Sequence, residues 1–166
     1  MKRMISTLLV LCSCFIIMAQ ENPPAPPYKR FPTVAPFKLL LADSASFYTK
    51  ADLPKKKSVL LLLFSPDCEH CQHETEEIIK HIDELKDVQI VMSTTQPLYK
   101  MKEFVKNYGL HRFKNITIGQ DVSHTLPPFY NIRFYPFLAF YNKKKELVSV
   151  FEGAMPINNL IAETQK

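Results

Sequence analysis

The stretch FSPDCEHCQHE, residues 64–74, joins two segments of different pattern and contains two cysteines separated by two residues. The run before it, SVLLLLF at 58–64, is continuously apolar and bounded by turn residues, which is typical of a strand buried on both faces. The segment after it carries apolar residues at helical spacing, namely Ile78, Ile79, Ile82 and Leu85. A buried strand, a bend and a helix that begins at or near Cys68 are therefore predicted.

The bend places Cys68 at the amino terminus of the predicted helix and Cys71 one turn further on. Free backbone N–H groups and the positive end of the helix dipole stabilise a thiolate at this position. The thiolate is the form that attacks a disulfide. A protonated His70 would favour it, whereas Asp67 and Glu69 would oppose it if they lie close. The cysteine pair is therefore predicted to be a redox couple.

Two other interpretations of the cysteine pair stay open. A disulfide that closes a four-residue loop contributes only about 2 kcal/mol in the loop-entropy model, so an inert staple would stabilise the chain little. A zinc or copper site would use Cys68 and Cys71 with His70 or His73, but a closed structural site needs four ligands. The other histidines lie scattered along the chain, at His81, His111 and His124.

Composition and charge favour one ordinary globular domain. The chain has 166 residues, of which 46% are hydrophobic and 22% charged, and its net charge is +5. Lysines are grouped at 55–57 and 143–145, where they flank apolar segments as solvated turn residues do. A nucleic-acid-binding face would interleave basic and aromatic residues, so no nucleic-acid partner is expected.

Residues 1–19 have the layout of a secretory signal peptide. Lys2 and Arg3 precede an apolar run that ends in the small residue Ala19. The run is shorter than the ~20 residues of a typical membrane-spanning helix, although retention as a membrane anchor and lipid attachment at Cys14 are alternatives. Cleavage would leave Cys68 and Cys71 as the only cysteines, in an oxidising compartment. The predicted location is periplasmic or otherwise extracytoplasmic.

Residues 20–36 contain six prolines and are predicted to form an extended linker without helix or sheet. The domain proper is placed at 37–166. After the loop-like stretch 43–57 and the strand–helix unit already described, strand and helix patterns alternate. Strands are predicted at 88–92, 115–118, 135–141 and 147–153, and helices at 97–109, 127–132 and 156–166. This order predicts an α/β fold with a central mixed sheet, a terminal antiparallel hairpin and helices on both faces.

From about Pro36 to its end, the chain resembles the thioredoxin-fold family, and in particular its exported thiol–disulfide oxidoreductases of the TlpA/ResA type. The segments that carry the resemblance are APFKLLL, VLLLLFSPDCEHC, IGQD, YNIRFYPFLAFYN and VFEG. The resemblance implies a thioredoxin-like fold.

The resemblance also implies roles for individual residues. Cys68 corresponds to the exposed nucleophile, Cys71 to the resolving cysteine and Pro136 to a cis-proline that faces the disulfide. Glu74 corresponds to a carboxylate that receives a proton behind the second cysteine, and His70 to a residue that tunes the thiolate. The alternatives are a water-facing acid for Glu74, an ordinary trans proline on an edge strand for Pro136 and an exposed loop residue for His70.

Three positions depart from the family pattern. Asp67 stands where many relatives have a tryptophan, Leu62 stands where cytosolic thioredoxins have a buried acid, and Tyr135 is a bulky residue before the proline. These departures affect the expected reduction potential and substrate range rather than the fold.

The sequence thus predicts an exported thiol–disulfide oxidoreductase that exchanges electrons with protein thiols and disulfides. No cofactor is expected, and a membrane redox protein would recycle the cysteine pair. Membrane contact is expected only if the N-terminal segment is retained or lipidated. One alternative is a non-catalytic thioredoxin-fold module that binds or delivers copper or zinc, and another is a scaffold that uses its proline-rich arm for protein contacts.

Overall fold

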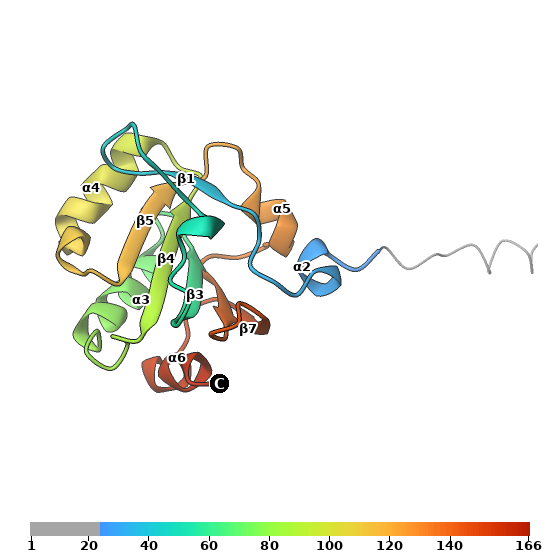
Figure 1. The fold of residues 1–166 in the computed structure, drawn as a ribbon. Coiled ribbons are helices and arrows are strands. Elements are labelled where there is room, and N and C mark those ends of the chain that lie inside the picture. Colours follow the sequence, from blue (N-terminus) through green and yellow to red (C-terminus); the bar gives the residue numbers. More distant parts are fainter. Residues whose placement is uncertain (1–23) are drawn as a thin grey trace, which may run out of the picture.

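A mixed sheet of seven strands organises residues 24–166, the part of the chain that the computed structural model describes (Figure 1). The strand order is β2-β1-β5-β4-β3-β6-β7. The centre consists of β3 (Ser58–Leu63), β4 (Val88–Thr94) and β5 (Ile116–Gln120), which run parallel. The predicted signal peptide at 1–19 lies outside the described residues.

The predicted terminal hairpin is confirmed. It consists of β6 (Phe137–Tyr141) and β7 (Leu147–Glu152), which pair antiparallel, and β6 also pairs antiparallel with β3. Every residue of β3, β4 and β6 is buried. This burial explains why β3 and β6 are almost wholly apolar instead of alternating, whereas β4 also buries the polar side chains of Gln89, Ser93 and Thr94.

Three helices connect consecutive strands, a fourth follows β7, and together they cover the sheet. They are α3 (Glu69–Lys80), α4 (Leu98–Tyr108), α5 (Leu126–Tyr130) and α6 (Ile157–Thr164), with short 3-10 turns at Lys50–Asp52 and Leu110–Arg112. As predicted, α4 begins after Pro97 and ends at Gly109, whose φ of 61° lies in the left-handed region that suits glycine. The apolar spacing of α3 continues to Leu85, but the helix ends at Lys80. Leu85 lies in the turns that follow the helix, and its side chain is buried there.

One strand was missed in the stretch predicted as loop. Within residues 43–57, β2 (Phe47–Thr49) pairs antiparallel with β1 (Lys38–Leu40) at the edge of the sheet. The strand has only three residues, and none of them is buried. Backbone pairing with β1, which a hydrophobic pattern does not report, therefore defines it.

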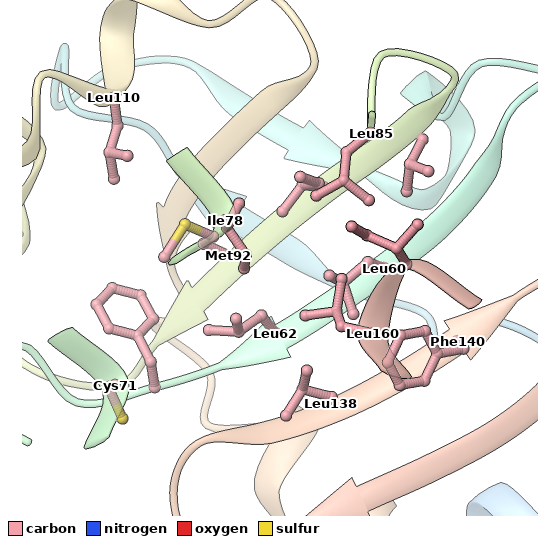
Figure 2. Close-up of a cluster of buried hydrophobic side chains, with 14 of the residues drawn as sticks. Leu60, Leu62, Cys71, Ile78, Leu85, Met92, Leu110, Leu138, Phe140 and Leu160 are labelled. Atoms are coloured by element: carbon pink, nitrogen blue, oxygen red, sulfur yellow. The ribbon is translucent and has the colours of Figure 1, made fainter. Parts of the chain in front are cut away.

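The sheet separates two hydrophobic clusters. Alternate side chains of β3 feed them, with Leu60 and Leu62 on one face and Leu61 and Leu63 on the other. The first cluster includes side chains of α3, α4 and α6, and Figure 2 shows Cys71 at one end of it. The second cluster includes Leu126 and Tyr130 of α5, so helices lie on both faces as predicted.

Residues 20–36 were predicted to be an extended linker without helix. This prediction is wrong for the described part, residues 24–36, which is called the arm below. Pro27–Arg30 form a helical turn, α2, because proline is tolerated in the first turn of a helix. Tyr28 packs against Tyr130 of α5 at a ring-centroid distance of 5.9 Å, and α2 and α5 lie side by side in Figure 1. Further along, Val34 and Ala35 are buried in the second cluster. The arm is therefore part of the folded domain.

A backbone contact also fixes the arm. The Leu147 N–H donates to the Pro32 carbonyl at 2.8 Å, and Thr33 forms an isolated bridge with Glu146.

Among the described residues, no helix has both the length and the apolar character needed to cross a membrane.

Candidate active site

The two cysteines lie where the sequence places them, at the start of α3. Cys68 is the N-cap residue, and its carbonyl accepts hydrogen bonds from the N–H groups of Cys71 and Gln72, both at 3.0 Å. The Cys68 N–H itself donates to the Ser65 carbonyl at 3.1 Å, which closes the bend after β3. The Cys68 side chain therefore lies at the positive end of a twelve-residue helix.

The Cys68 thiol faces the segment before β6. Its Sγ donates to the Tyr135 carbonyl oxygen at 3.9 Å, and the Tyr135–Pro136 peptide bond is cis. The geometry of the proline expected from the resemblance is thus confirmed, whereas the trans alternative is wrong. Pro136 is buried next to this carbonyl.

The two thiols differ in exposure. Cys68 is half-buried, whereas Cys71 is completely buried, and both are free cysteines. Burial raises the pKa of the Cys71 thiol far above its usual range, and a hydrogen bond to the Cys68 side chain adds to the rise. At neutral pH, Cys71 therefore holds its proton until a nearby base removes it.

Glu74 lies behind the cysteines on the buried face of α3. Only 1% of it is exposed, so the water-facing alternative is wrong. Its Oε2 accepts a hydrogen bond from the Met155 N–H at 2.8 Å, and its Oε1 is buried without a partner. Burial raises the pKa of this carboxyl above its ordinary value, while the bond from Met155 opposes the rise.

The remaining candidates divide between surface and core. His70 and His73 are both exposed on the first turns of α3. Leu62 is fully buried and belongs to the same hydrophobic cluster as Cys71. The structure therefore brings Cys68, Cys71, Glu74 and the Tyr135–Pro136 segment together and leaves His70 on the exposed side of the helix.

Two contacts at the site were not predicted from the sequence. The Met155 N–H that meets Glu74 comes from the loop after β7, eighty-one positions away in the chain. Lys100 of α4 pairs with Asp67, thirty-three positions away, directly before the first cysteine. Neither contact has a local pattern, although an acid next to a candidate nucleophile is itself a reason to look for a cation. Within residues 24–166, no three histidine, cysteine or acidic side chains gather as metal ligands would.

Comparison with known proteins agrees with this geometry. Residues 33–152 match the model of the AhpC/TSA family. The pneumococcal exposed lipoprotein thioredoxin from Streptococcus pneumoniae is 29% identical, with a TM-score of 0.59, over 78% of this chain and 99% of that chain. No curated protein sequence matches the chain.

Two further solved structures share the fold at lower identity. The first is a secreted Mycobacterium tuberculosis disulfide oxidoreductase homologous to E. coli DsbE. It is 22% identical, with a TM-score of 0.65, over 78% of this chain and 94% of that chain. StoA from Bacillus subtilis is 20% identical, with a TM-score of 0.61, over 80% of this chain and 99% of that chain. Because the family match spans more than half of the sequence, this chain belongs to the AhpC/TSA family and has a thioredoxin-like fold.

Proposed function

We propose that this protein is a thiol–disulfide oxidoreductase that acts on protein thiols and disulfides through Cys68 and Cys71. The observation that supports this most is the unequal burial of two free thiols at one helix start. Cys68 is partly exposed, so a partner can reach it, whereas Cys71 is fully buried next to Cys68. Such an asymmetry suits a nucleophile and a resolving group.

In the reducing direction, the Cys68 thiolate attacks one sulfur of a partner disulfide. A bond forms between Cys68 and that sulfur, the partner disulfide breaks, and the second partner sulfur leaves as a thiolate that takes up a proton. The amino terminus of α3 stabilises the attacking thiolate. The product of this first step is a mixed disulfide.

Cys71 then resolves the mixed disulfide. It loses its proton, attacks Cys68 Sγ and forms the Cys68–Cys71 disulfide, which releases the partner's remaining sulfur as a thiol. The partner gains two electrons and two protons, and the cysteine pair loses them; the reverse sequence oxidises a dithiol. Glu74 is the proposed acceptor of the Cys71 proton, because its Oε1 has no other partner and burial raises its pKa above the ordinary value.

Two more residues have proposed roles at the entrance. The Tyr135 carbonyl faces Cys68, so the Tyr135–Pro136 segment is placed to contact the backbone of a bound partner. His70, exposed on the first turn of α3, would favour the Cys68 thiolate when it is protonated.

The proposed location is extracytoplasmic, with residues 1–19 as a signal peptide. The cationic start and the apolar run of that segment support it. Two proteins of similar structure are described as an exposed lipoprotein and as a secreted oxidoreductase. The proposed core of the domain is 37–166, and residues 27–35 of the proline-rich segment before it fold onto this core. A membrane redox protein is the proposed partner that recycles the cysteine pair.

The reduction potential of Cys68 and Cys71 tests the proposal. The protein is equilibrated in glutathione or dithiothreitol buffers of graded potential, and its free thiols are trapped and counted. We expect a single two-electron transition. A midpoint near −270 mV, as in thioredoxin, would indicate a reductant, and one near −120 mV an oxidant. If the two cysteines form no disulfide at any potential, the redox function is wrong.

A further inference from the structure

Asp67 puts a negative charge directly before the nucleophilic sulfur. A carboxylate near a thiol disfavours the thiolate, so this residue opposes the chemistry proposed for Cys68. A cation close to Asp67 would offset this charge.

The offsetting charge comes from α4. Lys100 Nζ forms an ion pair and a hydrogen bond with Asp67 Oδ2. The Asp67 carboxylate is therefore directed to α4, whereas the Cys68 thiol is directed to the Tyr135 carbonyl before β6. The two neighbouring side chains thus have partners in different elements.

The ion pair lies beside a cavity of about 400 Å³ between the active-site bend and α4. The walls include Pro66, Gln72 and the exposed ring of Tyr99. Asp67 has 62% of its side chain exposed and Lys100 has 32%, so water reaches both groups. Exposed ion pairs stabilise a fold little, which leaves positioning as the larger consequence of this pair.

Other charges around the pair are few. The hydrogen bond to Asp67 raises the pKa of Lys100, and Tyr99 and Glu103 on α4 add to the rise. Lys100 is therefore a cation at neutral pH. Glu69, exposed on the first turn of α3, is a further acidic group next to the bend, and the imidazole of His70 is exposed beside it.

We propose that Lys100 is a positioning residue for thiol exchange, which holds the Asp67 carboxylate on the α4 side and offsets its charge next to Cys68. The consequence for exchange rests on the function proposed above. The effect on Cys68 itself does not, because the thiolate can be measured without any disulfide partner.

Alkylation of Cys68 is the test. The reduced full-length protein reacts with iodoacetamide at pH 7, and fragment masses assign the modification to Cys68 rather than to another cysteine. Lys100→Met leaves Asp67 unpaired, so we expect alkylation to slow by about threefold at low ionic strength. Added salt should shrink this difference, because exposed charges are screened.

Three further variants make the result specific. Lys102→Met removes the same charge from the same helix, but Lys102 contacts Ser44 instead, so its rate should stay at the wild-type value. Lys100→Arg keeps the positive charge, so Cys68 should be alkylated at the wild-type rate in this variant. In an Asp67→Asn background, Lys100→Met should have no further effect, because the carboxylate that Lys100 positions is gone.

Two results would overturn the proposal. An unchanged rate in Lys100→Met would show that the ion pair does not influence Cys68. Equal slowing by Lys100→Met with and without the Asp67→Asn substitution would show that Lys100 acts directly on the sulfur rather than through Asp67. If alkylation behaves as expected but no disulfide forms at any potential, the positioning role stands and the oxidoreductase function fails.

Discussion

The two faces of the sheet bury polar groups in different ways. On the face covered by α5 and the N-terminal arm, the hydroxyls of Tyr130 and Tyr141 hydrogen-bond to each other at 2.5 Å. On the face covered by α3, Cys71 is buried in the hydrophobic cluster, and Glu74 behind it keeps one oxygen without a partner. The two tyrosine hydroxyls satisfy each other, whereas Glu74 Oε1 has no partner; the other buried side-chain oxygen without a partner among residues 24–166 is Ser93 Oγ on β4.

The difference separates stability from chemistry. Buried polar groups that pair with each other cost little and fix the packing. A buried carboxyl with an open oxygen costs stability, and it persists at places where the group has a chemical role. Glu74 is three residues from Cys71 on the same helix, whereas the tyrosine pair is on the opposite side of the sheet. We therefore expect substitutions on the two faces to have separable effects.

The largest effect should come from neighbouring leucines on β3. Leu61 and Leu62 are both fully buried, but they face the second and the first cluster respectively. Leu61→Ala and Leu62→Ala should each lower the free energy of unfolding by about 3 kcal/mol, measured by urea denaturation. Because only Leu62 shares a cluster with Cys71, Leu62→Ala should also speed alkylation of Cys71 in the folded protein. Equal alkylation rates of Cys71 in the two variants would show that the two clusters do not differ in their effect on Cys71.

The arm should contribute the next largest effect. Val34 is completely buried, so Val34→Ala should lower the free energy of unfolding by about 2 kcal/mol. The exposed side chain of Thr33 provides the matched control, and Thr33→Ala should stay within about 0.5 kcal/mol of wild type. A Val34 variant as stable as wild type would show that the arm is a spacer after all.

The tyrosine pair should give a smaller loss. Tyr141→Phe deprives the buried Tyr130 hydroxyl of this partner, which should cost about 1 kcal/mol of unfolding free energy. Because the pair is on the face away from the cysteines, the midpoint potential of the Cys68–Cys71 couple should not change. A shifted potential in this variant would mean that the two faces are coupled.

Substitution of Glu74 should change the free energy of unfolding least, and it should raise this free energy where the other substitutions lower it. Burial raises its pKa in the folded state above its ordinary value of 4.5, so the folded protein binds this proton more tightly than the unfolded chain. Glu74 therefore lowers stability as the pH rises from the ordinary value through the raised one. Glu74→Gln should be more stable than wild type at pH 7, and the difference should shrink towards pH 4.

Urea denaturation across this pH range measures the effect, with the exposed Glu76 on the same helix as a control position. Glu76→Gln should show no such pH-dependent gain. A Glu74→Gln variant that is less stable than wild type at pH 7 would mean that the carboxylate is well paired, contrary to its open oxygen.

Local patterns predicted much of this molecule. Three features depend only on residues close together in the chain, and the structure confirms each of them. They are the apolar run of β3, the position of the two cysteines at the start of α3 and the ends of α4 at Pro97 and Gly109. The burial of Glu74 also has a local signal in the sequence. It lies three residues after Cys71 and four before Ile78, which is the spacing of one buried helix face.

Contacts between distant segments were not readable. β2 exists because β1 pairs with it, and the arm is ordered because Val34 and Ala35 reach the second cluster despite the prolines around them. The partner of Asp67 depends on where α4 crosses the bend. Each of these results depends on tertiary packing, which overrides local composition.

Trapping the mixed disulfide with oxidised glutathione distinguishes the cysteine that attacks, proposed as Cys68, from the one that resolves, proposed as Cys71. Cys71→Ser should retain glutathione on Cys68, as seen by mass spectrometry, because the buried resolving thiol is missing. Wild type should release the glutathione and end with a Cys68–Cys71 disulfide, and Cys68→Ser should take up little. A wild-type protein that keeps its glutathione, or a Cys68→Ser variant that reacts as fast as wild type, would contradict the account.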